Sequence, residues 1–248
     1  MRESCRIAKS TLDMIKGHIV PGVTTSQINE LVHSWTLGKN AWPSPLNYGS
    51  PPFPKSVCTS VNEVACHGVP GPRVLLEGDI INVDVTCYYP LPEGFHGDTS
   101  RTFMVGEVSA EDNKLLSVAE EALCQGIAQV RPGAALWDIG TAIEAYTRSE
   151  GHVVVKEAYG HGIGTKFHAP PRVPHYAPSP QEAIGDMRNC SLVEGMIFTI
   201  EPIIARSPLQ LVLDPRDGWS VLSACGGKTA QFEHTVRVTD DSVEILTA

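Results

Sequence analysis

The sequence has little positive charge and no long apolar run. Its 19 Lys and Arg residues against 28 Asp and Glu residues give a net charge of −9, and apolar residues make up 42% of the chain. A chain with this negative net charge lacks the positive electrostatic potential that attracts nucleic acids or anionic membranes. No apolar stretch approaches the ~18 residues of a transmembrane helix. We therefore expect a globular protein whose primary partner is neither a nucleic acid nor a membrane.

Cysteine frameworks and several familiar catalytic motifs are also missing. The seven cysteines are odd in number and none stands in a CxxC pair. This argues against a disulfide framework and a structural zinc finger, and it favours reduced, intracellular thiols. The sequence has no GxxxxGK[ST] phosphate loop and no GxSxG nucleophile elbow. It therefore gives no support for nucleotide binding through such a loop or for a serine nucleophile.

What the chain does contain is an internal repeat. Residues 6–19 carry apolar side chains at helical spacing and lead to Pro-Gly at 21–22. Residues 118–130 do the same and lead to Pro-Gly at 132–133, a shift of 111. A second amphipathic helix is predicted after each Pro-Gly, over residues 26–37 and 136–149. A repeat of this length indicates a chain built from two similar units.

The predicted strands repeat as well, with a shift of 117 between residues 75–84 and 192–201. In each segment a Glu-Gly turn leads into a β-rich stretch that ends on a carboxylate, Asp84 or Glu201. The sequence therefore predicts two α-α-β-β halves, about 1–110 and 111–248, within a single catalytic domain spanning residues 1–248. The expected class is α+β, a central antiparallel sheet with helices packed on its outer face. Strands are predicted near 80–88, 99–105, 197–203, 219–222 and 230–239, and loops at 47–55, 175–191 and 206–218.

Four acidic residues stand in or beside these strands, where carboxylates are costly. Asp84 and Glu201 lie in otherwise apolar stretches, Asp98 opens the strand after the turn at 90–97, and Glu233 starts the last long strand. A buried carboxylate costs several kcal/mol unless it is paired or binds a metal, and few Lys or Arg residues are near these four. Together with His161 they form an oxygen-rich ligand set that suits two divalent metals such as Mn, Fe, Co or Zn.

Each of these residues also has a simpler explanation. An acid on an edge strand can be solvated, an acid at a helix end can cap the helix, and a histidine among glycines can be purely structural. The glycines around His161, at positions 160, 162 and 164, would let a ligand approach the backbone closely. The metal hypothesis depends on finding four such acids together on repeat-related strands.

Six short motifs occur along the chain. They are PKSVCTSVNEVACHGVP at 54–70, INVDV at 81–85, HGDTS at 96–100, GHGIG at 160–164, FTIEP at 198–202 and AQFEHT at 230–235. In sequence and order they resemble the motifs of the type 1 methionine aminopeptidases. AWPSPLNY at 41–48 and VPHYA at 173–177 look closest to the eukaryotic-type members. The resemblance runs along nearly the whole chain and implies the pseudo-two-fold "pita-bread" fold.

The resemblance also implies a hydrolase with two divalent metal ions, Co, Mn, Fe or Zn, and a role for particular residues. The metal ligands would be Asp84, Asp98, His161, Glu201 and Glu233. Asp98 and Glu233 would bridge the two ions, and Glu201 would also shuttle the proton. The catalytic residues would be Glu201 with two histidines, His67 and His168, which would contact the substrate and the developing tetrahedral centre.

The resemblance further implies a pocket for the methionine side chain. Its lining residues would be Tyr48, Phe53, Cys58, Phe167 and Trp219. Aromatic rings and a thiol would accept a flexible thioether well, although the same aromatic residues could equally be ordinary core residues. A monovalent cation would bind near Asn62, Val64 and Thr229.

The implied activity is removal of the initiator methionine from nascent proteins and from peptides whose second residue is small. We expect a cytoplasmic monomer that acts on nascent N-termini, with the ribosome as a further candidate partner. An organellar location also fits, because the chain begins inside the expected first helix. Proline-specific peptidases of the same fold are the alternative enzyme class, and a metal-free relative that only binds a partner is the alternative outside enzymes.

Overall fold

The computed structural model describes residues 1–179 and 190–248. Its helices are α1 (Arg2–Lys16), α2 (Thr25–Gly38), α3 (Ala110–Ile127) and α4 (Leu136–Ser149). The strands are β1 (Trp42–Pro43), β2 (Cys58–Val61), β3 (Val64–Cys66), β4 (Ile80–Tyr89), β5 (Phe95–Met104), β6 (Val153–Val154), β7 (Tyr159–Gly162), β8 (Ala169–Pro174), β9 (Ile197–Ile200), β10 (Ile203–Ala205), β11 (Leu211–Leu213), β12 (Val221–Ser223), β13 (Thr229–Gln231), β14 (His234–Val238) and β15 (Val243–Ile245).

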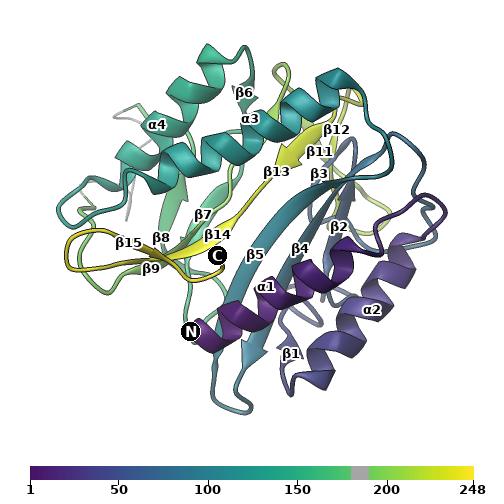
Figure 1. The fold of residues 1–248 in the computed structure, drawn as a ribbon, viewed down its shortest axis with the longest axis horizontal. Coiled ribbons are helices and arrows are strands. Elements are labelled where there is room, and N and C mark those ends of the chain that lie inside the picture. The colour runs from purple at the N-terminus through teal and green to yellow at the C-terminus, as the bar shows by residue number, and fades with distance from the viewer. Residues whose placement is uncertain (180–189) are drawn as a thin grey trace.

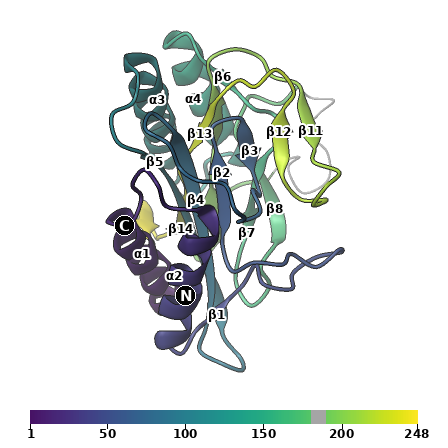
Figure 2. The ribbon, with the colours of Figure 1, turned by 90° about the vertical axis from the view of Figure 1, so that its right-hand side faces the viewer.

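The four helices lie on one side of the strands. Figure 2 shows α1 to α4 on one side of β4, β5 and β14, with β8, β11 and β12 on the other. In Figure 1, α1 and α2 cover one half of the strand layer and α3 and α4 the other. All strand pairings in the described part of the chain are antiparallel. The predicted α+β class, with helices on the outer face of antiparallel strands, is confirmed.

The strands form four hydrogen-bonded groups. These have the orders β1-β4-β2 with β5 beside β4, β13-β10-β6, β11-β12-β3, and β15-β14-β9-β7-β8. The longest pairing is the β4–β5 hairpin, which runs in register from Ile80 opposite Met104 to Tyr89 opposite Phe95. Its length makes it a rigid platform at the middle of the molecule.

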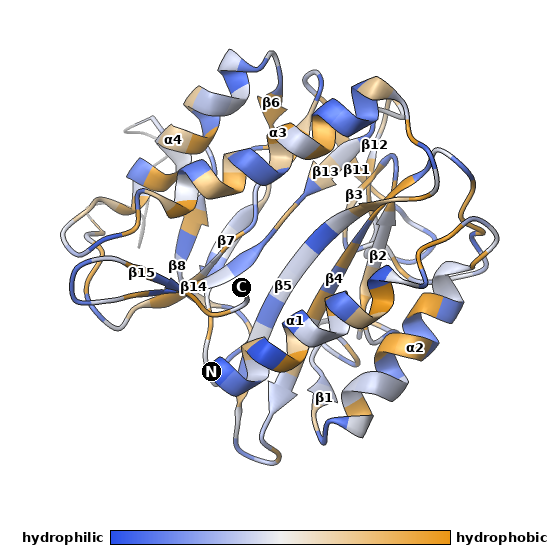
Figure 3. Ribbon diagram, viewed as in Figure 1, coloured by the Kyte–Doolittle hydropathy of each residue, from blue (hydrophilic) through white to orange (hydrophobic). Residues whose placement is uncertain are grey.

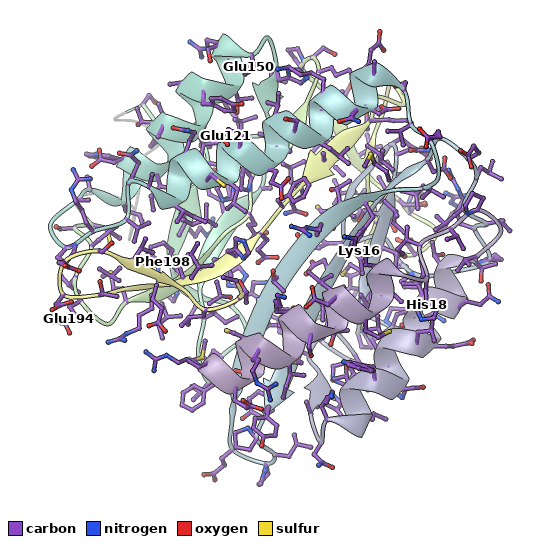
Figure 4. All side chains as sticks on the ribbon, in the orientation of Figure 1. Lys16, His18, Glu121, Glu150, Glu194 and Phe198 are labelled. Atoms are coloured by element: carbon purple, nitrogen blue, oxygen red, sulfur yellow. The ribbon has the colours of Figure 1, made fainter. Side chains whose placement is uncertain are left out.

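Each half has its own apolar core between helices and strands. In the first half, buried residues such as Ile15, Ile28 and Val83 belong to one cluster. A second cluster, which includes Ile139 and Phe198, lies under α3 and α4. Figure 3 shows both helix pairs with mixed apolar and polar surfaces, as expected of helices with one buried face. In Figure 4 Phe198 lies on the strands, whereas Glu121 and Glu150 belong to the helical layer above them.

The repeat predicted from the sequence is present in the backbone. Gly78 and Gly195 both adopt a positive φ, +86° and +88°. Their N–H groups donate to equivalent carbonyls, those of Val105 and Val238, at 3.0 and 2.9 Å. Positive φ is strained for a side chain with a Cβ, which explains a glycine at both positions. The two Glu-Gly turns are therefore structurally equivalent.

Two of the predicted strands are interrupted. The strand predicted over 197–203 is divided into β9 and β10, which belong to different sheets, with Glu201 and Pro202 between them. Proline has no N–H to donate to a ladder, which accounts for the break. The strand predicted over 230–239 divides in the same way into β13 and β14, and Glu233 lies in the gap.

One predicted loop contains a strand: the segment 206–218 includes β11, which pairs with β12. The glycine-rich stretch around His161 includes β7, for which no strand was predicted. The segment 47–55 is free of helix and strand, as predicted. In the predicted loop 175–191, residues 180–189 lie outside the described part of the chain. No helix in the described part is both long and apolar enough to cross a membrane.

Candidate active site

The β4–β5 hairpin supplies two carboxylates to the inner face of the sheet. Asp84 lies opposite Ser100 and Asp98 opposite Thr86, so the two acids are diagonal neighbours on one face of the ladder. The Thr86 hydroxyl donates to Asp98 Oδ1 at 2.7 Å. Asp98 does not open its strand as predicted: β5 starts at Phe95, because the ladder continues almost to the tip of the hairpin.

The second half brings three more side chains to the same place. His161 lies on β7, Glu201 in the break after β9, and Glu233 directly before β14. His161 Nε2 lies 3.6 Å from Asp98 Oδ2 and 3.6 Å from Glu201 Oε1. One ligand atom each of Asp98, His161 and Glu233 lies within 4.8 Å of the other two. The structure therefore gathers Asp98, His161 and Glu233 closely, with Glu201 beside His161, and all five predicted ligands line one cavity although they come from both halves.

Burial strongly disfavours the charged forms of these acids. It raises the pKa of Asp84 from 3.8 to about 6. Burial, with the charge of Asp84 in second place, raises the pKa of Glu201 from 4.5 to about 8. The pKa values of Asp98 and Glu233 are also raised well above the ordinary range, by burial first and by the neighbouring carboxylates second. Four buried acids that repel one another favour either protonation or a bound cation.

The donor set fits a divalent metal. Asp84 Oδ1 and Glu233 Oε1 are buried without a hydrogen-bond partner in the structure. Among the described residues, no Lys or Arg forms an ion pair with any of the four acids, and the basic side chain paired with them is that of His161. Carboxylate oxygens and one imidazole are the ligands of hard or borderline divalent ions. A cation at this point would satisfy the unpaired oxygens and relieve the repulsion.

Three residues not predicted as site residues hold Glu201 in place. Its N–H donates to His175 Nε2 at 3.1 Å, and the Thr199 hydroxyl donates to its Oε1 at 2.9 Å. Gln231 Nε2 donates to the Glu201 carbonyl at 3.1 Å and to Oε2 at 3.3 Å. Burial lowers the pKa of His175 to about 3, which keeps its ring neutral and able to accept. All three residues lie inside motifs identified in the sequence analysis, and this position in a motif was the signal that could have identified them as site residues.

The glycines beside His161 have a structural explanation. A Cβ on Gly160 would lie 2.2 Å from the Thr199 carbonyl oxygen, and one on Gly162 would lie 2.1 Å from that of Pro170. At Gly160 and Gly162 the close approach is therefore made by the backbones around β8 and β9, whereas Gly164 has open space around it, and approach of a ligand stays a prediction. The glycines let neighbouring chain segments pack tightly against β7 and so fix the position of His161.

The acids lie at the bottom of a cavity of about 630 Å³, and all predicted substrate contacts line it. Phe53 and Trp219 meet edge to face with ring centroids 5.3 Å apart. Trp219 Nε1 donates to the Pro51 carbonyl at 3.1 Å. Cys58 lies on β2 opposite Asp84, and burial raises the pKa of its thiol well above the usual value. One wall of the cavity is therefore aromatic and uncharged.

The two predicted catalytic histidines line the same cavity and have different neighbours. The His67 ring is perpendicular to Trp219 at 6.2 Å. His168 lies 4.2 Å from the His161 ring, and its Nδ1 forms a 2.7 Å hydrogen bond with the Tyr48 hydroxyl. Tyr48 also packs against Phe167 at 4.9 Å. Burial lowers the pKa of His168 to about 3, so its ring is neutral in the absence of other ligands.

The three residues predicted around a monovalent cation come from neighbouring segments. Thr229 N–H donates to the Asn62 carbonyl at 3.2 Å, and Val64 begins β3 two residues after Asn62. The Asn62 side chain donates a hydrogen bond to Asp79 Oδ1 and accepts one from the Ile80 N–H. A cation here stays a prediction.

The sequence matches the metallopeptidase family M24 over residues 1–240. The chain belongs to this family. Membership implies dependence on divalent metal ions, in agreement with the donor set. It also confirms the predicted resemblance in its broad form.

Comparison with individual proteins supports the same family assignment. The chain is 43% identical over 247 residues to the methionine aminopeptidase of Rickettsia prowazekii, covering all of this chain and 91% of the relative. It is 45% identical to methionine aminopeptidase 1A of Arabidopsis thaliana, covering all of this chain and 59% of the plant protein. The crystal structure of the Rickettsia enzyme superposes with a TM-score of 0.92 at 42% identity, covering 100% of this chain and 95% of that one. This match confirms the predicted pita-bread fold of the M24 chain.

Proposed function

We propose that this M24 chain is a methionine aminopeptidase that removes the N-terminal methionine from polypeptides whose second residue is small. The observation that carries the proposal is the single cavity shared by the buried acids, the two histidines and the aromatic wall. The 43–45% identity to proteins named methionine aminopeptidase supports the same activity. Because both halves line the cavity, we also propose that residues 1–248 act as one catalytic domain.

The proposed cofactor is a pair of divalent ions, Co, Mn, Fe or Zn. Asp84, Asp98, His161, Glu201 and Glu233 would hold them, with Asp98 and Glu233 shared between the two. When bound, such ions polarise a carbonyl and lower the pKa of water. The unpaired carboxylate oxygens of Asp84 and Glu233 support this assignment.

Glu201 is proposed as the residue that moves the proton. It would accept a proton from the attacking water and deliver it to the leaving amine. Contacts from Thr199 and Gln231 hold both of its carboxylate oxygens, so the side chain needs no reorientation between the two steps. His67 and His168 would contact the scissile carbonyl from either side, with the Tyr48 hydroxyl fixing the ring of His168.

The side chain of the substrate would lie against the aromatic wall. Phe53, Phe167 and Trp219, with Tyr48 and Cys58, present rings and a neutral thiol and no charge. Thioether sulfur packs favourably against aromatic rings, which suits methionine better than a charged residue. Nascent chains offer such N-termini, so we further propose cytoplasmic action by a monomer, with the ribosome as a candidate partner.

The test compares three peptides on chelator-treated protein titrated with Mn or Co. Cleavage of Met-Ala-Ser, and little of Met-Lys-Ser or Ala-Pro-Ser, with activity restored near two ions per chain, is the expected result. Cleavage of Ala-Pro-Ser instead would favour the proline-specific peptidases. A prolidase from Pyrococcus furiosus has the same fold, with a TM-score of 0.73 at 18% identity. No cleavage and no metal uptake would favour a binding protein.

A further inference from the structure

A second hollow adjoins the active-site cavity along β6. It has a volume of about 360 Å³ and is lined by residues of α4, by the run 152–157, and by Pro208 and Leu209. Glu157, an exposed residue, lines both this hollow and the active-site cavity. The two spaces therefore share one lining residue, Glu157. We call the second one the β6 groove.

The edge of β6 gives this groove free main-chain groups. β6 is the last strand in the order β13-β10-β6 and pairs with β10. The Val155 N–H donates to the Ile203 carbonyl at 2.9 Å, on the β10 side. Main-chain groups alternate in direction along an antiparallel strand, so those of Val154, between the paired residues Val153 and Val155, point away from β10. Val154 lines the groove, and an edge of this kind is a template for another extended chain.

The groove carries as many acidic as basic side chains, Glu144 and Glu157 against Arg148 and Lys156. Glu144 forms ion pairs with Arg148 at 3.2 Å and with Lys156 at 3.3 Å. Val153 and Leu209 pack against the small apolar cluster beneath the groove. Balanced charges and an apolar floor give little basis for selecting side chains by charge. The groups that the edge offers for hydrogen bonding are therefore main-chain N–H and C=O groups.

We propose that the β6 groove binds the part of the polypeptide that follows the scissile bond, in an extended conformation, through main-chain hydrogen bonds to Val154. This inference rests on the proposed aminopeptidase function, which requires the rest of the substrate to leave the cavity. Glu157 lines both the cavity and the groove, which places the edge of β6 next to the active site. Main-chain recognition suits a substrate whose sequence varies from one protein to the next, because every peptide carries the same backbone groups.

The first experiment uses the metal-loaded wild-type protein and a series of peptides. Met-Ala-Ser is extended with serine to about ten residues, and each amide beyond the third residue is then N-methylated in turn. We expect kcat/KM to rise with length and then level off. N-methylation should lower it about three- to tenfold at the one position whose N–H reaches the Val154 carbonyl, the loss expected of one hydrogen bond, and should have little effect at the two neighbouring positions. Amide exchange at residues 152–157 should slow when the long peptide is present.

A variant tests the protein side of the same contact. Val154→Pro removes an outward-pointing N–H from an edge strand, where proline is tolerated. Ile245→Pro on the edge strand β15 is the matched control, because Leu246 N–H donates to β14 and the Ile245 N–H therefore points outward. We compare, within each variant, the ratio of kcat/KM for the long peptide to that for Met-Ala-Ser. The ratio should fall about three- to tenfold in Val154→Pro and stay unchanged in Ile245→Pro.

Three results would overturn the proposal. They are a kcat/KM independent of peptide length, no single position at which N-methylation lowers kcat/KM, and an equal ratio in the two proline variants. If Val154→Pro does not fold, the N-methylation scan still decides, because it uses the wild-type protein. Failure of the wild-type protein to cleave Met-Ala-Ser at all would instead count against the proposed function itself.

Discussion

The two halves of the molecule share one backbone plan. In the first, the Gly22 N–H donates to the Leu75 carbonyl at 2.8 Å, and in the second the Gly133 N–H donates to the Leu192 carbonyl at 2.8 Å. The Glu-Gly turns that follow are equivalent too, and each feeds a strand that leads to a carboxylate. The repeat therefore delivers Asp84 and Glu201 to the same cavity by the same route.

The halves differ in how they hold that carboxylate. β4 continues without a break through Asp84, whose Oδ1 has no hydrogen-bond partner. In the second half, strand β9 ends at Ile200, and the next residue, Glu201, forms hydrogen bonds with His175, Thr199 and Gln231. A carboxylate with an open oxygen suits a metal ligand, and one held at both oxygens suits repeated proton transfer. The duplicated plan has therefore given its two acids different surroundings.

The largest expected effect comes from replacing the carboxylate that each half supplies, Asp84 or Glu201, with the corresponding amide. Glu201→Gln should lower kcat by about 10²- to 10⁴-fold, the loss typical of a missing general base. Asp84→Asn should act mainly through metal content, so its activity should recover as the Mn concentration is raised. Kinetics at several Mn concentrations and metal analysis of both variants would distinguish the two behaviours. Full activity of Glu201→Gln would contradict the proton-shuttle role.

The second expected effect is on stability against pH. Folded-state pKa values of about 6 for Asp84 and about 8 for Glu201 exceed the ordinary 3.8 and 4.5. The folded, metal-free protein therefore holds more protons than the unfolded chain between pH about 4 and about 8, and its stability falls as pH rises through that window. Bound metal requires deprotonated carboxylates and should reverse the trend.

Melting temperatures with chelator and with Mn, measured across this pH window, would check the effect. Asp84→Asn and Glu201→Gln should each make the fall shallower, because each removes one of the four acids whose pKa is raised in the folded protein. A metal-free protein whose stability rises with pH would contradict the burial of uncompensated acids.

The third effect concerns the contacts that only the second half has. His175→Leu leaves the buried Glu201 N–H without its acceptor, which should cost about 1–3 kcal/mol of unfolding free energy. We expect kcat to fall about tenfold, with little change in KM, because a misplaced base affects the chemical step. His175→Gln can supply an oxygen acceptor and should recover most of both losses. Equal kcat values for the Leu and Gln variants would show that the hydrogen bond does not position Glu201.

The smallest effect tests the equivalence of the two turns. Gly78→Ala and Gly195→Ala should each destabilise the protein by about 1–2 kcal/mol, because alanine is strained at positive φ. A Cβ at either position has no close neighbour, so the two losses should be equal. Gly17→Ala, at negative φ and in open space, is the control and should be neutral or slightly stabilising. Unequal losses, measured by denaturant unfolding, would show that the turns differ energetically.

Much of the fold was predictable because local patterns agreed with it. The helical spacing before and after Pro-Gly predicted four helices, and all four are present. The breaks at Glu201 and Glu233 were missed because apolar residues on both sides resemble one continuous strand. The strand β11 was missed because three residues among prolines and charges give too short a pattern.

The sequence by itself determined the repeat, the α+β class and the identity of the residues that gather at the site. Periodicity, turn residues and motif order are properties of the chain and need no coordinates. The tertiary structure decided which atoms meet: that Asp98 faces Thr86, that His175 accepts the Glu201 amide, and that Glu157 lines two hollows. These contacts join segments far apart in the chain. Only the packing of one half against the other brings such segments within hydrogen-bonding distance.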